Sequence, residues 1–273
     1  MLKLIQPSDL VFENLEYRRD IILFNVLDRA IRPSAFLLAS DGESYIIARN
    51  RADLACWVWT GSDITKAALN EIMDALHLHF GGRELIVTAK PDVVKIVENH
   101  FAPLGYLDPT HTGLIAYQLN RLLPTPAVGR LRAATLEDLD MTCDWFRSFH
   151  ADCFDRPLFE DPRPAQEASI IAGYTHLLMA EDKPVCMVKV AQEADKPYCL
   201  VHTVYTPPQY RGLGYAKQAV SDAVKPYLHQ GLYALLYADA CNPRSNAAYQ
   251  HIGFEAVGTV IETTMKLGTT SSI

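Results

Sequence analysis

The sequence predicts an α+β (mixed α/β) fold built from two similar halves, and three observations support this prediction. Apolar residues recur at helical spacing in some segments and fill short strand-like runs in others, and the two kinds alternate along the chain. The segment 121–130 contains two prolines and a glycine, which indicates a linker between candidate domains 1–125 and 126–273. A shift of 148 residues places the expected elements of the first half on those of the second, which indicates an internal repeat.

The first half is predicted to contain a strand–helix–strand–helix–strand unit. Leu54 and Gly105 of this unit match His202 and Gly253 in the repeat. The expected elements span 54–59, 63–80, 83–88, 92–101 and 114–119.

The second half is predicted to open with a helix over 136–149, in which Thr135 caps the first turn and Asp138 lies three residues further on. Pro226 is expected to kink or close the last turn of a later helix, before Gly231 ends it. The remaining elements are strands at 175–180, 185–191 and 199–206, a helix over 216–228, a strand at 232–238, a helix from Asn242 to His251, and a strand at 259–266.

Composition excludes several classes of protein. The chain has 273 residues with 25 basic and 32 acidic side chains, a net charge of −7, which disfavours nucleic acid as a partner. Its six cysteines form no Cys-x-x-Cys unit, so we expect no bound metal. No secretory leader or long apolar run occurs in the sequence, which favours a cytoplasmic protein without a membrane partner.

The segment Arg211-Gly212-Leu213-Gly214-Tyr215-Ala216 lies between an expected strand and an expected helix. The first N–H groups of a helix have no partner within it, and glycines allow a ligand to approach the backbone closely. The turn is therefore a candidate site for a phosphate or a diphosphate. A dinucleotide fingerprint would need a third glycine where Lys217 stands. The alternative is a plain tight turn.

These residues resemble a known family. Arg211-x-x-Gly214-x-Ala216 is similar to the coenzyme-binding signature of the GNAT superfamily of N-acetyltransferases, and the resemblance covers roughly residues 130–267. It implies two tandem GNAT-like halves, each a mixed, largely antiparallel sheet flanked by helices. The first half looks degenerate, because Thr60-Gly61-Ser62 stands where the glycine turn would be. A second conserved block of the family is similar to Asn242-Pro243-x-Ser245-Asn246-x-x-Tyr249-x-x-x-Gly253-Phe254.

The resemblance also implies a set of site residues for acetyl-CoA. The central strand would splay from its neighbour and pair with the pantetheine arm through Val204, Tyr205 and Thr206. Asn242 would bind the pantetheine end or cap the last helix, and Asn246 belongs to the same block. Tyr249 would protonate the leaving thiolate, or else pack in the core. The diphosphate would lie on the amides of Arg211, Gly212, Leu213, Gly214, Tyr215 and Ala216.

The base is ambiguous in this sequence. A lysine-like amine with a pKa of about 10.4 is neutral in only about one molecule in 2,500 at pH 7, so a group that removes its proton is expected. Many family members carry a glutamate on or beside the central strand, but 199–206 has no carboxylate. His202 is the candidate there, with a hydrogen-bonded structural histidine as the alternative, and Asp239 is a weaker candidate.

The sequence thus predicts an N-acetyltransferase that transfers an acetyl group from acetyl-CoA to a primary amine of a small molecule or peptide. The amine would attack directly in a ternary complex, and the protein would be a monomer or a homodimer. One alternative is a coenzyme-A-binding sensor or interaction module without turnover. Others are an enzyme that uses a different acyl-CoA and a protein that binds another phosphate compound, such as a nucleotide.

Overall fold

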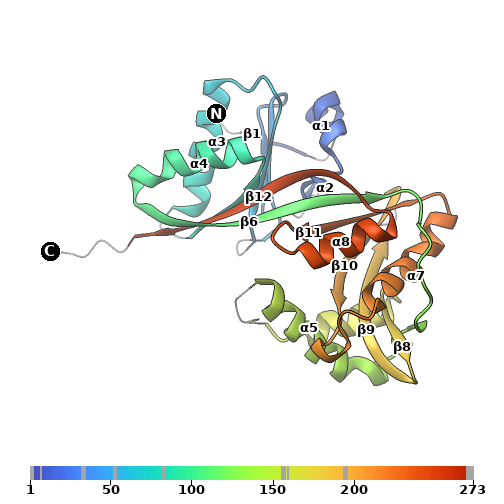
Figure 1. Ribbon diagram of the computed structural model, residues 1–273. Coiled ribbons are helices and arrows are strands. Elements are labelled where there is room, and N and C mark those ends of the chain that lie inside the picture. Colours follow the sequence, from blue (N-terminus) through green and yellow to red (C-terminus); the bar gives the residue numbers. More distant parts are fainter. Residues whose placement is uncertain are drawn as a thin grey trace. The chain divides into compact units, whose positions relative to one another are not determined.

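The computed structural model describes residues 3–6, 8–31, 35–51, 54–81, 84–154, 158, 160–192 and 196–268 (Figure 1). The chain forms two compact units. Unit 1 comprises Met1–Ala116, Asp239–Cys241 and Val257–Ile273, and unit 2 comprises Tyr117–Ala238 and Asn242–Ala256. The chain first passes from unit 1 to unit 2 at Tyr117, before the predicted boundary at 125/126, and its last segment belongs to unit 1.

Unit 1 is built on a mixed sheet in the order β1-β2-β3-β4-β5-β12-β6. In this sheet β4 and β5 are parallel, and the neighbouring pairs β1–β2, β2–β3, β3–β4 and β5–β12 are antiparallel. The strands are β1 (Lys3–Leu4), β2 (Leu37–Ser40), β3 (Tyr45–Arg49), β4 (Cys56–Thr60), β5 (Leu85–Ala89), β6 (Tyr106–Leu119) and β12 (Glu255–Leu267). The helices are η1 (Leu10–Glu13), α1 (Leu15–Asp20), α2 (Asn25–Ala30), α3 (Lys66–Phe80), α4 (Pro91–Phe101) and η2 (Ala102–Leu104).

The core of unit 1 forms between its sheet and α3 and α4. Thr65 caps α3 by accepting a hydrogen bond from the N–H of Ala68 at 3.1 Å. Apolar residues then recur at three- and four-residue steps, so that one face of each helix is buried against the strands. The buried helical residues are Ala68, Ile72, Met73, Ala75, Leu76, Phe80, Val93, Val94, Val97 and Phe101.

The strands of unit 2 are hydrogen-bonded in the order β11-β10-β9-β8-β7. Here β10 and β11 are parallel, and the other pairs are antiparallel. The strands are β7 (Arg130–Ala133), β8 (Thr175–Ala180), β9 (Lys183–Gln192), β10 (Tyr198–Tyr205) and β11 (Tyr233–Asp239). The helices are η3 (Leu136–Asp138), α5 (Leu139–Phe154), α6 (Arg163–Ile171), η4 (Pro208–Tyr210), α7 (Tyr215–His229) and α8 (Pro243–Ile252).

The strand arrangement of the two units confirms the prediction of two tandem halves with the same mixed fold. The order and the directions of β1 to β5 are repeated in β7 to β11. One feature was not predicted: β12, the last strand of the chain, pairs with β5 in unit 1, with Thr263 opposite Val87. The strand that follows α8 in sequence therefore completes the sheet of the other half.

Most predicted elements are confirmed, with shifted ends. The strand expected at 114–119 is the end of a longer strand that begins at Tyr106, and residue 83, in the strand expected at 83–88, lies outside the described residues. Pro226 lies inside α7, which continues to His229. The capping box of Thr135 and Asp138 is present.

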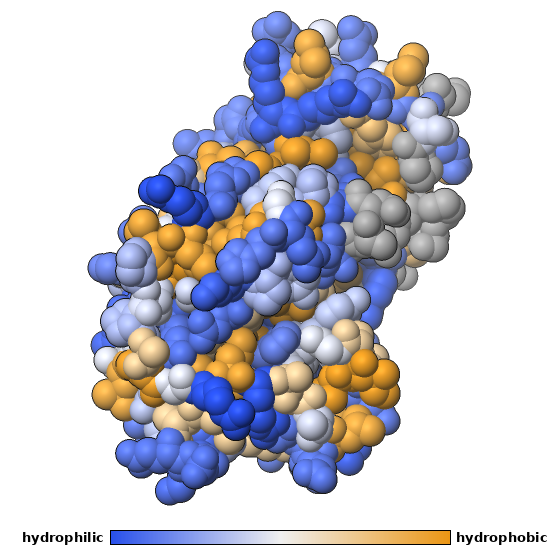
Figure 2. Space-filling view, turned by 90° about the vertical axis from the view of Figure 1, so that its right-hand side faces the viewer, coloured by the Kyte–Doolittle hydropathy of each residue, from blue (hydrophilic) through white to orange (hydrophobic). Residues whose placement is uncertain are grey.

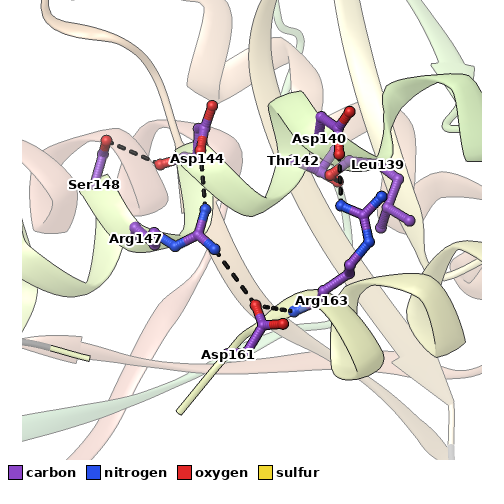
Figure 3. Close-up of polar contacts among 8 residues, drawn as sticks. All are labelled: Leu139, Asp140, Thr142, Asp144, Arg147, Ser148, Asp161 and Arg163. Carbon is purple, nitrogen blue, oxygen red and sulfur yellow. Dashed lines mark hydrogen bonds and ion pairs between the residues drawn. The ribbon is translucent and has the colours of Figure 1, made fainter. Parts of the chain in front are cut away.

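Helices α5 and α6 are joined by ion pairs (Figure 3). Arg163 at the start of α6 contacts Asp140 of α5 at 2.5 Å. Arg147 of α5 contacts Asp144 at 2.9 Å and Asp161 at 3.4 Å, and Asp161 also accepts the N–H of Arg163 at 3.2 Å. Because these side chains are exposed, each pair adds little stability.

The surface is mixed in character. On the face shown in Figure 2, patches of hydrophobic residues alternate with hydrophilic ones. In the part of the chain that the structure describes, every helix is too short or too polar to cross a bilayer.

Candidate functional site

The parallel strands β10 and β11 separate within unit 2. Their register pairs Tyr198, Cys199 and Leu200 with Tyr233, Ala234 and Leu235, and no later pair occurs among the described residues. On its other edge β10 continues along β9, with a bulge between Val201 and Val204. Among the described residues, the end of β10 therefore has one edge that no β11 residue pairs with. The family resemblance implied that the pantetheine arm would pair with this part of the chain, at 204–206.

A glycine loop follows β10 and leads into α7. Gly212 and Gly214 have φ angles of 80° and 83°, a left-handed conformation that other residues adopt only with strain. Gly214 is the N-cap residue of α7 and offers no side chain to the first turn. The amides at the start of α7 thus lack the side-chain acceptor that usually caps a helix, and the helix dipole favours an anion there.

The Arg211 side chain braces this loop. Its Nε donates to the carbonyl oxygen of Thr206 at 2.9 Å, and its Nη2 contacts Asp152 at 2.6 Å. The guanidinium also lies 5.9 Å from the centre of the Tyr205 ring. In this structure the guanidinium is thus engaged with Thr206 of the same loop and with Asp152 of α5.

A cleft of about 240 Å³ lies beside the loop. A water molecule occupies about 30 Å³ in the liquid, so the cleft has room for a group several times larger. Lys217, in the first turn of α7, brings a cation to its wall. The other lining residues are Thr125, Pro126, Val128, Gly212, Leu213 and Gly214.

Asn242 and Asn246 both lie at the start of α8. Asn242 caps the helix, because its side chain accepts the N–H of Ser245 at 3.1 Å. Asn246 donates through Nδ2 to the carbonyl oxygen of Asn242 at 2.8 Å. Its Oδ1 accepts a hydrogen bond from the hydroxyl of Tyr117 at 3.1 Å. The capping role of Asn242 is thus observed, whereas its contact with a ligand stays a prediction.

Tyr249 projects from α8 into an aromatic group. Its ring centre lies 6.3 Å from that of Tyr117 and 5.9 Å from that of Phe254. Burial raises the pKa of the Tyr249 phenol, and negative charge on the Cys186 or Cys153 thiol would raise that pKa further. Tyr249 is therefore a neutral hydrogen-bond donor at physiological pH.

The candidate bases lie in different settings. His202 is exposed on β10, within the bulge. Asp239, at the end of β11, accepts the N–H of Cys241 at 2.8 Å. The structure adds Lys189 of β9, which is buried, and its ammonium lies 5.3 Å from the Phe146 ring centre. Burial lowers the pKa of Lys189 to about 8.

The sequence patterns did not identify two of these residues, Tyr117 and Lys189, as site candidates. Tyr117 precedes the linker and belongs to the strand expected at 114–119, yet it lies in unit 2 beside Asn246 and Tyr249. Lys189 lies in an apolar strand, and only its charge in that setting could have drawn attention. Within the described ranges, no group of three or more His, Cys, Asp or Glu side chains could hold a metal ion.

Comparison with known proteins agrees with this geometry. Residues 139–254 match the model of the Acetyltransferase (GNAT) family. This range includes α5, the glycine loop and the residues of α8. A search of curated proteins gave no significant match.

Solved structures share the fold at low sequence identity. A GCN5-related N-acetyltransferase from Sphaerobacter thermophilus is 16% identical, with 97% of this chain and 95% of that chain covered and a TM-score of 0.62. A Drosophila protein is 12% identical, with coverages of 97% and 98% and a TM-score of 0.64. A tandem GNAT protein from the clavulanic acid biosynthesis pathway is 13% identical, with 99% of both chains covered and a TM-score of 0.55.

The family match and the fold agree with each other, and together they support acyl transfer in general. Residues 139–254 of this chain form an acetyltransferase domain of the GNAT family.

Proposed function

We propose that the protein is an acetyl-CoA-dependent N-acetyltransferase that acts on a primary amine of a small molecule or peptide. One observation carries the proposal: the uncapped start of α7 opens beside a cleft, directly after the strand that has separated from β11. A diphosphate would accept hydrogen bonds from the amides of 211–216 and interact favourably with the helix dipole. The thioester arm would then run along the end of β10.

The end of β10 has groups that suit a pantetheine arm. This arm carries amide groups, and a strand edge without a partner offers N–H and C=O groups to them. Thr206 adds a buried hydroxyl oxygen that lies beside the Cys186 thiol and has no geometrically satisfactory hydrogen-bond partner among the described residues. A ligand amide would satisfy that oxygen, which would otherwise be costly to bury.

In the reaction, the neutral amine would attack the thioester carbonyl carbon, and the C–S bond would break as the tetrahedral intermediate collapses. The N–H of Val204 or Tyr205 is the candidate donor to the oxyanion. Tyr249 would donate a hydrogen bond to the departing sulfur. Its pKa is raised above about 10, whereas a thiol has a pKa near 8.5, so complete proton transfer would be uphill by about 2 kcal/mol or more. Stabilisation of the thiolate by a hydrogen bond is therefore the role that suits this phenol.

The amine must lose a proton before it attacks. His202 is exposed in the bulge of β10 and could take this proton through water. Lys189 is the second candidate, because burial lowers its pKa to about 8. The two candidates predict different pH profiles: kcat/KM of His202→Gln would lose the inflection that a histidine base produces, whereas that of Lys189→Met would lose one near pH 8.

Calorimetric titration of the full chain with acetyl-CoA tests the proposal, followed by acetyl transfer to a panel of amines between pH 6 and pH 9. We expect micromolar binding and turnover with at least one amine. Binding without turnover at any pH would favour a coenzyme-A-binding sensor or interaction module. Faster transfer from a longer acyl-CoA would identify that thioester, in place of acetyl-CoA, as the acyl donor. Displacement of acetyl-CoA by stoichiometric ATP would indicate that the site binds a nucleotide.

A further inference from the structure

The linker between the two halves of the sequence lines the cleft beside the glycine loop. Thr125, Pro126 and Val128 face the loop residues and Lys217 across a volume of about 240 Å³. All of these residues belong to unit 2. The linker thus forms a wall of the cleft as well as a connection between β6 and β7.

One side chain holds this wall in place. Gln218 of α7 is buried, and its Oε1 accepts the N–H of Val128 at 2.6 Å. Its Nε2 donates to the carbonyl oxygen of Gly129 at 2.9 Å and to Asp222 at 2.9 Å. Two consecutive backbone groups of the linker are therefore held by one amide, in the first turn of the helix that also presents the candidate anion site.

We propose that Thr125, Pro126 and Val128 are part of the acyl-CoA site, and that Gln218 is a positioning residue that sets the width of the cleft. This inference rests on the proposed function, because it assigns the diphosphate of the coenzyme to the cleft. Lys217 supplies a positive charge on one wall, and the linker supplies an uncharged wall opposite. The linker then acts on the nucleotide end of the donor and has no contact with the acetyl group or the amine.

Charged substitutions in the linker test whether its residues lie beside the diphosphate of the coenzyme. Val128→Glu would put a carboxylate beside the diphosphate and should weaken coenzyme A binding at least tenfold, while Val128→Lys should keep or tighten it. Ala127→Glu is the matched control, because Ala127 is exposed on the same segment but does not line the cleft. Equal affinity in Val128→Glu and Ala127→Glu would overturn the assignment.

The role of Gln218 is tested with two acetyl donors. Gln218→Met should raise KM for acetyl-CoA about tenfold, with little change in kcat. With S-acetylpantetheine, which lacks the nucleotide and the diphosphate, the variant and the wild type should have equal kcat/KM. An equal loss with both donors would show a merely structural role and overturn the proposal. If Gln218→Met does not fold, the Val128 variants still test whether the linker lines the acyl-CoA site.

Failure of the proposed function would look different. In that case the wild-type protein would bind neither coenzyme A nor acetyl-CoA, and the assignment of the linker to the acyl-CoA site would fail with the proposed function. Failure of the linker assignment alone would leave tight binding in the wild type and in every linker variant.

Discussion

The two halves treat the start of the equivalent helix in opposite ways. In unit 1, the turn between β4 and α3 is closed by the chain's own acceptors: Glu16 accepts the N–H of Ser62 at 2.8 Å and its hydroxyl at 2.7 Å. Thr65 then caps α3 itself. In unit 2, Gly214 begins α7 with no side-chain cap. In unit 1 the Glu16 carboxylate thus accepts hydrogen bonds in the turn before α3. At the corresponding position in unit 2, the first amides of α7 have no side-chain acceptor.

A second difference concerns one hydroxyl group. The shift of 148 residues matches Phe101 with Tyr249 and Tyr106 with Phe254, and both pairs pack edge to face at 5.2 Å and 5.9 Å. In unit 1 the hydroxyl is on the strand, where Tyr106 donates to the carbonyl oxygen of Phe80 at 3.1 Å. In unit 2 it is on the helix, on Tyr249.

Under the proposed function, these differences explain how one fold can keep its core in both units and offer a ligand site in only one of them. The aromatic pair and the strand order are common to both units, because packing requires them. The groups that cap the helix and the position of the tyrosine hydroxyl differ between the two units. Under the proposed function, helix amides without an acceptor from the chain itself are needed only where a ligand binds. The presence of an intramolecular acceptor at the start of α3, and its absence at the start of α7, is therefore the observed difference that the proposed function explains.

The largest effect is expected from closing the open site. Gly214→Asp should weaken acetyl-CoA binding at least 100-fold in calorimetry. A carboxylate about 5 Å from the diphosphate costs about 3 kcal/mol at an effective dielectric constant of 20. Gly231→Asp is the matched control, since Gly231 has a φ angle of 81° and open space around it at the far end of α7. Both variants carry similar backbone strain, so equal loss of binding would refute the electrostatic explanation.

The next largest effect is expected from removal of the Tyr249 hydroxyl. Tyr249→Phe gives α8 the side chain that α4 has in unit 1. It should lower kcat about 10- to 100-fold and leave the Kd of acetyl-CoA unchanged, because the hydrogen bond to sulfur forms as the C–S bond breaks. Tyr106→Phe is its counterpart: it should lower the melting temperature through loss of the bond to Phe80 and leave kcat unchanged. Unchanged turnover in Tyr249→Phe would remove the phenol from the mechanism.

A smaller effect is expected at Tyr117, which supports α8 from β6. Tyr117→Phe removes the hydrogen bond to Asn246 and should lower kcat about 3- to 10-fold. A double-mutant cycle with Asn246→Ala should give a coupling of about 1 kcal/mol in the free energy of unfolding. Additive effects of the two substitutions would show that the bond does not position the helix.

The sequence predicted the parts of the site that depend on local patterns. Prolines, glycines and helical spacing located β10, the glycine loop, α7 and α8, because these signals act over a few residues. It did not predict the pairing of β12 with β5, since an apolar strand carries no label for its partner. Nor did it reveal the contacts of Gln218 with the linker or of Tyr117 with Asn246, which join residues 90 and 129 positions apart.

The smallest effect concerns the internal carboxylate of unit 1. The side-chain and backbone hydrogen bonds from Ser62 lower the pKa of Glu16. A lowered folded-state pKa means that the carboxylate contributes stability above its unfolded pKa of about 4.3, and that this contribution is lost as the pH falls through the folded value. Glu16→Gln should therefore lower the melting temperature slightly at pH 7, and the difference from wild type should shrink towards pH 3. Glu255→Gln, at an exposed position in β12, is the matched control for the substitution itself. If the melting temperature of Glu16→Gln matched that of wild type at pH 7, the carboxylate would not be a stabilising internal anion, and the absence of a glycine loop alone would distinguish unit 1 from unit 2.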